Sequence, residues 1–194
     1  MVDIRERLGC YIIKLDHQFA LDNYDYVMNE IRDKTVKDIY NVLGPFDHHA
    51  HCAADDELDS QRTMKDDFEG RRSGARYRGQ VSSQSLKPDG IGFKVYPNNA
   101  MFEGFFEEGM INGYGRGITS RGEVYQGPFV YDTMEGKGLF QWPDGRLFFG
   151  NFKNGKKDGE GTYMWPNGQV YEGEFKSDEC AGDGKIHYPD GKTY

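Results

Sequence analysis

Apolar and polar residues alternate along most of the chain from residue 77 to its end. Tyr171, Gly173 and Phe175 occupy every second position and therefore share one face of a predicted strand. A returning strand carries its own set at Gly161, Tyr163 and Trp165. Between such strands lie short polar segments such as 154–155, an Asn-Gly pair typical of a hairpin turn with positive φ. The pattern predicts consecutive β-hairpins.

The hairpin pattern repeats every 23 residues. Each unit reads aromatic-x-Gly-x-aromatic, then Gly-x-Gly, then aromatic-Pro-Asp/Asn-Gly, and glycine leaves room for a ring to lie against bare backbone. The first unit is two residues longer, and Tyr194 would open a sixth unit, so the array either continues past Tyr194 or stops there. The predicted units are 77–101, 102–124, 125–147, 148–170 and 171–194.

These motifs resemble the MORN repeat, over about 60% of the chain. The resemblance implies a mainly β protein, with the hairpins stacked side by side into one elongated, single-layer antiparallel sheet. It also implies a non-catalytic scaffold that binds other proteins, in a cytoplasmic setting such as the cytoskeleton or a ciliary axoneme.

Residues 1–45 have a different pattern and predict a short helical segment before the sheet. Capping residues Asp22 and Thr35 precede apolar positions at helical spacing, which predicts helices over 22–33 and 35–43. Gly44 and the following proline end the second helix. Helices this short are unstable alone in water, so their apolar sides must pack on something. Residues 10–15 are a candidate strand.

Residues 46–76 are predicted to be a polar linker, and they contain one cluster of metal-capable side chains. The cluster is His48, His49, His51 and Cys52. Zinc sites usually draw ligands from two separated arms, and only one crowded arm is present. A solvated loop is the favoured interpretation, although a partner chain could supply further ligands. No metal and no cofactor is predicted.

Composition narrows the class further. Glycine accounts for 26 residues, of which only four precede residue 77, so the chain changes architecture there. The net charge of −8 argues against nucleic acid as a partner. The three cysteines, Cys10, Cys52 and Cys180, have no motif spacing and favour a reducing compartment. No apolar run is long enough to predict a membrane span.

Catalytic motifs are not found. The segment 191–193 (Gly-Lys-Thr) imitates the end of a phosphate-binding loop, but Ile186 stands where that loop needs glycine. The dinucleotide-binding and serine-hydrolase motifs do not occur either. The sequence therefore predicts a binding protein rather than an enzyme.

One basic cluster offers an alternative function. Lys153, Lys156 and Lys157 could contact acidic phospholipids, as a membrane tether would. Acidic residues such as Asp158 and Glu160 stand beside them, so an ordinary solvated turn is the stronger interpretation.

The aromatic residues of the repeats should gather on one face of the sheet. We predict that a partner polypeptide binds there, unless strong curling of the sheet and stacking of rings bury them within the array. In the second unit Gly117 and Thr119 replace bulky residues, which predicts a shallow notch. The candidate partner-binding residues are Tyr96, Phe102, Phe106, Tyr125, Phe129, Phe140, Trp142, Phe148, Phe152, Tyr163, Trp165, Tyr171, Phe175 and Tyr188.

Overall fold

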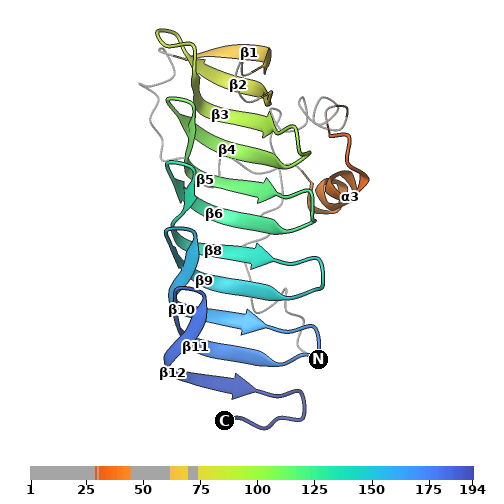
Figure 1. Cartoon of the computed structure of the whole chain (residues 1–194), viewed down its shortest axis with the longest axis vertical. Coiled ribbons are helices and arrows are strands. Elements are labelled where there is room, and N and C mark those ends of the chain that lie inside the picture. The colour runs from red at the N-terminus through yellow and green to blue at the C-terminus, as the bar shows by residue number, and fades with distance from the viewer. Residues whose placement is uncertain (1–28, 30, 45–61, 70–73) are drawn as a thin grey trace.

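The protein forms one long antiparallel sheet with a helix beside it (Figure 1). The computed structural model describes residues 29, 31–44, 62–69 and 74–194. The strands follow one another across the sheet in chain order, from β1 to β12, and β7 pairs only with β6. This confirms the predicted fold: a mainly β, elongated single-layer sheet of stacked hairpins, preceded by a helix.

Apart from the two-residue β7, the strands are six to nine residues long. Their bounds are β1 Arg62–Glu69, β2 Arg76–Ser82, β3 Pro88–Val95, β4 Met101–Glu107, β5 Met110–Ile118, β6 Val124–Val130, β7 Thr133–Met134, β8 Gly136–Gln141, β9 Leu147–Lys153, β10 Lys156–Met164, β11 Val170–Lys176 and β12 Glu179–His187.

A row of paired glycines crosses the sheet. In β9 and β10, Gly150 lies opposite Gly161, and the ring of Phe148 lies over both. A Cβ atom on Gly150 would come within 2.7 Å of the Phe148 ring and 2.5 Å of the Gly161 Cα. The same arrangement recurs beneath the opening aromatic of every repeat. The Gly-x-Gly and aromatic-x-Gly motifs therefore exist so that rings can lie against the backbone.

Helix α3, Lys34–Leu43, confirms the helix predicted over 35–43. Its N-cap is Asp33, whose side chain accepts from the Val36 amide at 3.1 Å, so the predicted cap at Thr35 was wrong. Thr35 is already inside the helix. The C-cap is Gly44 at φ 71°, and its N–H donates to the Tyr40 carbonyl.

The other N-terminal predictions fall mainly on residues that the structure does not describe. Within the predicted helix 22–33, residue 29 is helical and residues 31–33 are not. The candidate strand at residues 10–15 and the cluster from His48 to Cys52 lie outside the described residues.

Strand β1 corrects the linker predicted over 46–76. Residues 62–69 pair with β2, where Phe68 lies opposite Tyr77 and Thr63 opposite Val81. The edge of β2 presents backbone N–H and C=O groups that need partners, and β1 supplies them. Charged residues and a register shift between Lys65 and Phe68 break the apolar alternation here, which hid the strand from pattern analysis.

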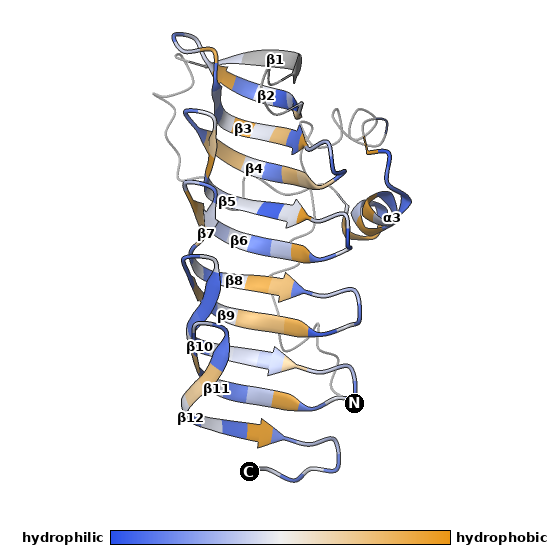
Figure 2. Cartoon of the chain, viewed as in Figure 1, coloured by the Kyte–Doolittle hydropathy of each residue, from blue (hydrophilic) through white to orange (hydrophobic). Residues whose placement is uncertain are grey.

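The two faces of the sheet have separate apolar clusters. Phe102 and Tyr125 belong to the cluster of stacked rings, whereas Met101 and Val124, one residue earlier, pack with α3. Adjacent residues of a strand point to opposite faces, so α3 lies on the face opposite the rings. Figure 2 shows that hydrophobic and hydrophilic residues alternate along α3, and its Val36 and Tyr40 are the residues buried against the sheet.

Candidate partner-binding surface

Each repeat begins with an aromatic residue, and most repeats have a second one four residues later. These rings pack against one another and are not exposed to solvent. Phe148 is fully buried, and its ring meets those of Phe152 and Phe175 edge-on, with centroids 5.2 Å and 5.0 Å away. Tyr125 meets Phe129 and Phe152 in the same way. T-shaped pairs at this spacing are favourable, so the rings form a continuous core along the sheet.

The buried tyrosines keep their hydroxyl groups satisfied. Tyr125 and Tyr171 donate to the carbonyl oxygens of Pro128 and Glu174, at 3.1 Å and 3.2 Å. Burial raises the pKa of Tyr125 far above its ordinary value, with smaller contributions from Tyr114 and Glu135. These phenols therefore remain neutral core groups at physiological pH.

The structure thus divides the fourteen candidate binding residues into two groups. Nine are buried in the ring core and offer little surface to a partner. This is the outcome expected if stacking of the rings buries them within the array. The nine residues are Phe102, Phe106, Tyr125, Phe129, Phe148, Phe152, Tyr163, Tyr171 and Phe175. The remaining five are half-buried and retain accessible surface; these are Tyr96, Phe140, Trp142, Trp165 and Tyr188.

Three half-buried rings of the third and fourth repeats form a continuous line with the buried ring of Tyr163 between the two tryptophans. Phe140 and Trp142 have centroids 4.5 Å apart, Trp142 and Tyr163 5.6 Å, and Tyr163 and Trp165 4.6 Å. We call these four residues the ring ladder. Phe140 lies in β8 and Tyr163 in β10, and each tryptophan follows its strand, at the start of an aromatic-Pro turn. The ladder is an aromatic strip carried by neighbouring strands of the sheet.

Two cations border the ring ladder. The Arg146 guanidinium lies 5.0 Å from the Trp142 ring and donates to the Tyr163 hydroxyl at 3.2 Å. The Lys157 ammonium lies 5.5 Å from Trp142 and 5.4 Å from Tyr163. Cations over ring faces are attracted by the ring quadrupole, so both side chains help to fix the ladder.

The prediction that Lys157 lies on an ordinary solvated turn was wrong. Its side chain is only 15% exposed and points to the ring face, 3.8 Å from Asp178. The signal was present in the repeat: the equivalent position holds Ile111 and Met134, which pack with the ring core.

The predicted notch lies beside Gly117 in β5. A Cβ atom there would meet nothing closer than 3.9 Å, so the space beside it is open. On one flank the Lys94 ammonium lies 5.0 Å from the Tyr96 ring. Burial, and to a lesser extent the charge of Asp132, raises the pKa of Tyr96 to about 12. Burial also lowers the pKa of Lys94.

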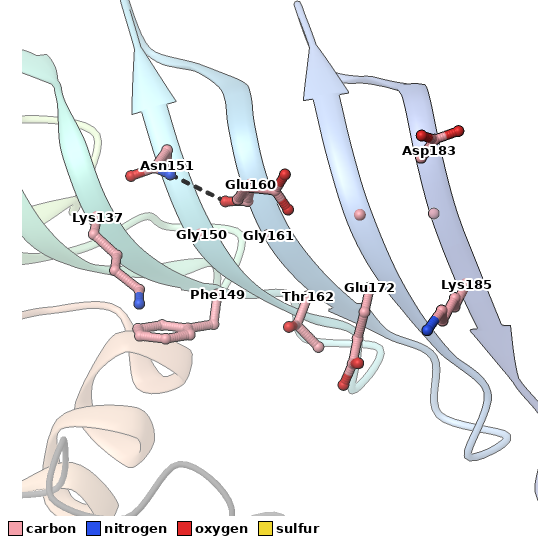
Figure 3. Close-up of a pocket in the computed structure, with 12 residues that line it drawn as sticks. Lys137, Phe149, Gly150, Asn151, Glu160, Gly161, Thr162, Glu172, Asp183 and Lys185 are labelled. Atoms are coloured by element: carbon pink, nitrogen blue, oxygen red, sulfur yellow. Dashed lines mark hydrogen bonds between the residues drawn. The ribbon is translucent and has the colours of Figure 1, made fainter.

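The opposite face contains a second feature, which sequence analysis missed. Beyond α3 an open groove of about 680 Å³ runs over β8 to β12 (Figure 3). Phe149 lies beneath the Lys137 ammonium at 4.7 Å, while Asn151 donates to the Glu160 carbonyl at 3.2 Å. Glu172 and Lys185 line the far end. The clue was the apolar residues, such as Phe149, at positions that alternate with the ring face.

Where α3 covers this face, a charged pair is buried beneath it. Arg116 donates to the Glu103 carboxylate through Nε at 2.7 Å, and the Tyr40 hydroxyl donates to the same carboxylate at 3.2 Å. Arg116 also donates to the Gly44 carbonyl, at the end of α3. These bonds fix the helix to β4 and β5, because a buried charge must be paired.

No described helix is long and apolar enough to span a membrane. In the described part of the chain, no group of three or more His, Cys, Asp or Glu side chains is placed to hold a metal ion.

The fold and the repeated ring-on-glycine packing define a class: repeat proteins built from stacked β-hairpins. The sequence model of the MORN repeat matches residues 102–116, 125–145, 148–170 and 171–193. The chain therefore contains MORN repeats within residues 102–193, as its motifs predicted. A search of curated proteins found no match.

Two solved structures are among those similar to this chain. One is the TCP domain of SAS-4 (dCPAP) from Drosophila melanogaster, in complex with a proline-rich motif of Ana2 (dSTIL). It is 12% identical at a TM-score of 0.38, with 73% of this chain and 79% of that chain covered. The other is the G-box domain of the microcephaly protein CPAP, 18% identical at a TM-score of 0.38, with 71% and 80% covered.

Proposed function

We propose that the protein is a non-catalytic scaffold that binds a partner polypeptide along the ring ladder, within a larger assembly. The observation that carries this proposal is the contrast between the sealed ring core and the half-buried ladder on the same face. Trp142 and Trp165 keep accessible surface, and their indole N–H groups make no hydrogen bond within the described residues. Tryptophan in this state is typical of interface anchors.

The surroundings of the ladder suit a polypeptide. Arg146 and Lys157 give it a charged border, and an apolar centre with a polar rim is the usual anatomy of a protein interface. A cytoskeletal or ciliary setting in the cytoplasm is part of the proposal, on the strength of the family. The partner is a protein, and nucleic acid is disfavoured by the charge of −8.

A pull-down from the native source tests the proposal, with the tagged full chain as bait. Trp142→Ala and Trp165→Ala should each reduce recovery of the principal partners about tenfold, the effect of losing an interface hot spot. Lys156→Ala, at an exposed turn, should recover them as the native chain does. A larger loss for Lys156→Ala than for both tryptophan variants would contradict the proposal.

A membrane tether is the second candidate, favoured by exposed lysines at neighbouring hairpin turns, Lys153, Lys156 and Lys176. It predicts co-sedimentation with anionic phosphatidylserine vesicles, weakening as salt is added. Absence of binding at low salt would exclude it.

A further inference from the structure

Exposed apolar side chains gather on the turns at one edge of the sheet. Seven large hydrophobic residues are exposed in the described part of the chain, and four of them lie in or directly beside three consecutive hairpin turns. They are Leu86, Met110, Val130 and Tyr131, which we call the tip row. The equivalent turns of the next two repeats, 153–156 and 176–179, are polar, and Figure 2 colours that part of the edge as hydrophilic.

The turn at Tyr131 is unfavourable for the residue that it contains. Tyr131 and Asp132 have φ of 44° and 65°, both in the left-handed region. The equivalent turn of the fourth repeat has Asn154 and Gly155 at φ 50° and 74°, the pair that such a turn prefers. A bulky aromatic residue with positive φ is strained. Strain of this kind is often kept where a side chain has a function.

Neighbouring residues hold the strained turn in place. The Ile111 amide donates to the Asp132 carboxylate at 2.8 Å, and the Asp132 amide donates to the Ile111 carbonyl at 2.8 Å. The Tyr131 amide donates to Asn112 at 3.3 Å. The turn is therefore fixed by the preceding hairpin, and the Tyr131 side chain, which is 56% exposed, is not needed to hold it.

The charge around the tip row is negative. Glu107, Glu108 and Asp132 are exposed on the same turns. Lys87 is paired with Glu108 at 2.9 Å, and Lys94 lies close enough to Asp132 for their charges to interact, so the acidic residues still outnumber the basic ones. A partner that complements this edge carries basic residues beside its apolar ones.

The spacing of the turns selects the conformation of that partner. Each repeat adds two strands, so successive tips are roughly 10 Å apart. One heptad of an α-helix rises about 10.5 Å, so a helix can present an apolar residue to each tip. An extended strand covers the same distance in about three residues. Because side chains alternate between the two faces of a strand, every second contacting residue would then point away from the tips.

We infer that the tip row is a docking surface for a basic amphipathic helix of a partner protein. The site lies on the hairpin edge and does not depend on the ring ladder, so it goes beyond the function proposed above. Apolar residues one heptad apart contact the three tips, and flanking lysines or arginines lie beside Glu107, Glu108 and Asp132.

A labelled synthetic peptide tests this by fluorescence anisotropy with the full chain. The probe is about three heptads long, with leucines on one side and lysines flanking them. Tyr131→Asn should weaken binding at least tenfold without lowering the melting temperature, because asparagine tolerates positive φ. Ser177→Asn, the matched change in the fifth repeat, should change neither quantity.

Further variants and probes distinguish a basic helix from other ligands of the tip row. Trp142→Ala should leave peptide affinity unchanged, and a glutamate-flanked version of the peptide should not bind. The inference is overturned if Tyr131→Asn binds the probe as well as the native chain does. Equal binding of a proline-rich extended peptide, binding of the chain to phosphatidylcholine/phosphatidylserine vesicles through Tyr131, or loss of peptide binding in Trp142→Ala would also overturn it.

Discussion

The two faces of this sheet are sealed in different ways. On the ring face, the repeat supplies both the aromatic side chains and the glycines on which they lie, so each unit packs against its neighbours without outside help. The opposite face has no such motif. It is buried where α3 covers Phe93, Met101 and Ile118, and it stays open over β8 to β12, where Phe149 lies in a groove.

This difference shows which positions the repeat determines and which positions it allows to vary. Ring and glycine positions are fixed by contacts between consecutive strands, so they recur every 23 residues and tolerate little change. Residues of the opposite face vary from the buried Glu103–Arg116 pair to the exposed Glu172. Different parts of that face can therefore be covered by different elements, such as α3, or remain exposed.

The sharpest test of the comparison uses two adjacent phenylalanines. Phe148→Ala, on the ring face, removes a fully buried ring and should lower the free energy of unfolding by about 4 kcal/mol. Phe149→Ala, on the open face, should cost about 1 kcal/mol, because its ring is only half-buried. Urea unfolding of both variants measures the difference, and equal losses would show that the faces are sealed alike.

A pair of glycines in β5 tests the ring packing itself. A Cβ at Gly115 would overlap the Phe102 ring and lie 2.9 Å from the Glu103 carbonyl oxygen. Gly115→Ala should therefore destabilise the protein by about 3 kcal/mol. Gly117→Ala, two residues along the strand, has open space and should be nearly neutral. Thermal unfolding distinguishes them, and a harmless Gly115→Ala would refute the close-approach role.

The cover on the opposite face is tested at the helix. Tyr40→Phe removes the hydroxyl that donates to Glu103 and should cost about 1 kcal/mol, the usual worth of one hydrogen bond to a charged group that keeps another partner. Val42→Ala, on the exposed side of α3, is the control and should change stability little. Chemical unfolding followed by circular dichroism gives both values; the opposite order would mean that α3 is not docked through Tyr40.

A smaller effect should appear at high pH. The pKa of Tyr96 is raised to about 12, so its phenol holds its proton more tightly in the folded protein than in the unfolded chain. The resulting stabilisation is present below pH ~10 and is lost as the pH rises through about 12. A titration followed by tyrosinate absorbance should show one phenol that loses its proton at unusually high pH in the native protein and that is missing in Tyr96→Phe. A difference centred near pH 10 would contradict the burial of Tyr96.

Much of the fold follows from the sequence because its determinants are local or periodic. The ring and glycine spacing predicts the hairpins, and Gly44 predicts the end of α3. Other features depend on long-range contacts. Strand β1 forms because the edge of β2 needs a partner, and α3 selects its face through Arg116 and Glu103, far along the chain.

The candidate site was predicted less completely for a similar reason. Alternation places Phe148 and Trp142 on the same face, but only the stacking of neighbouring repeats decides that Phe148 is sealed and Trp142 is not. The inward position of Lys157 follows from the same stacking. The groove over Phe149 is open because α3 does not extend over that part of the sheet. The repeat pattern carries no information about how far α3 extends.

The tryptophans of the ring ladder stay accessible while the ring core is closed, and both of them can report on this difference directly. Trp142 and Trp165 both belong to the ladder, so all tryptophan fluorescence originates there. Acrylamide quenching of the native chain should show both indoles partly accessible, and a bound partner should protect them. Indoles that are fully shielded in the free protein, or equally quenched with partner bound, would contradict the account.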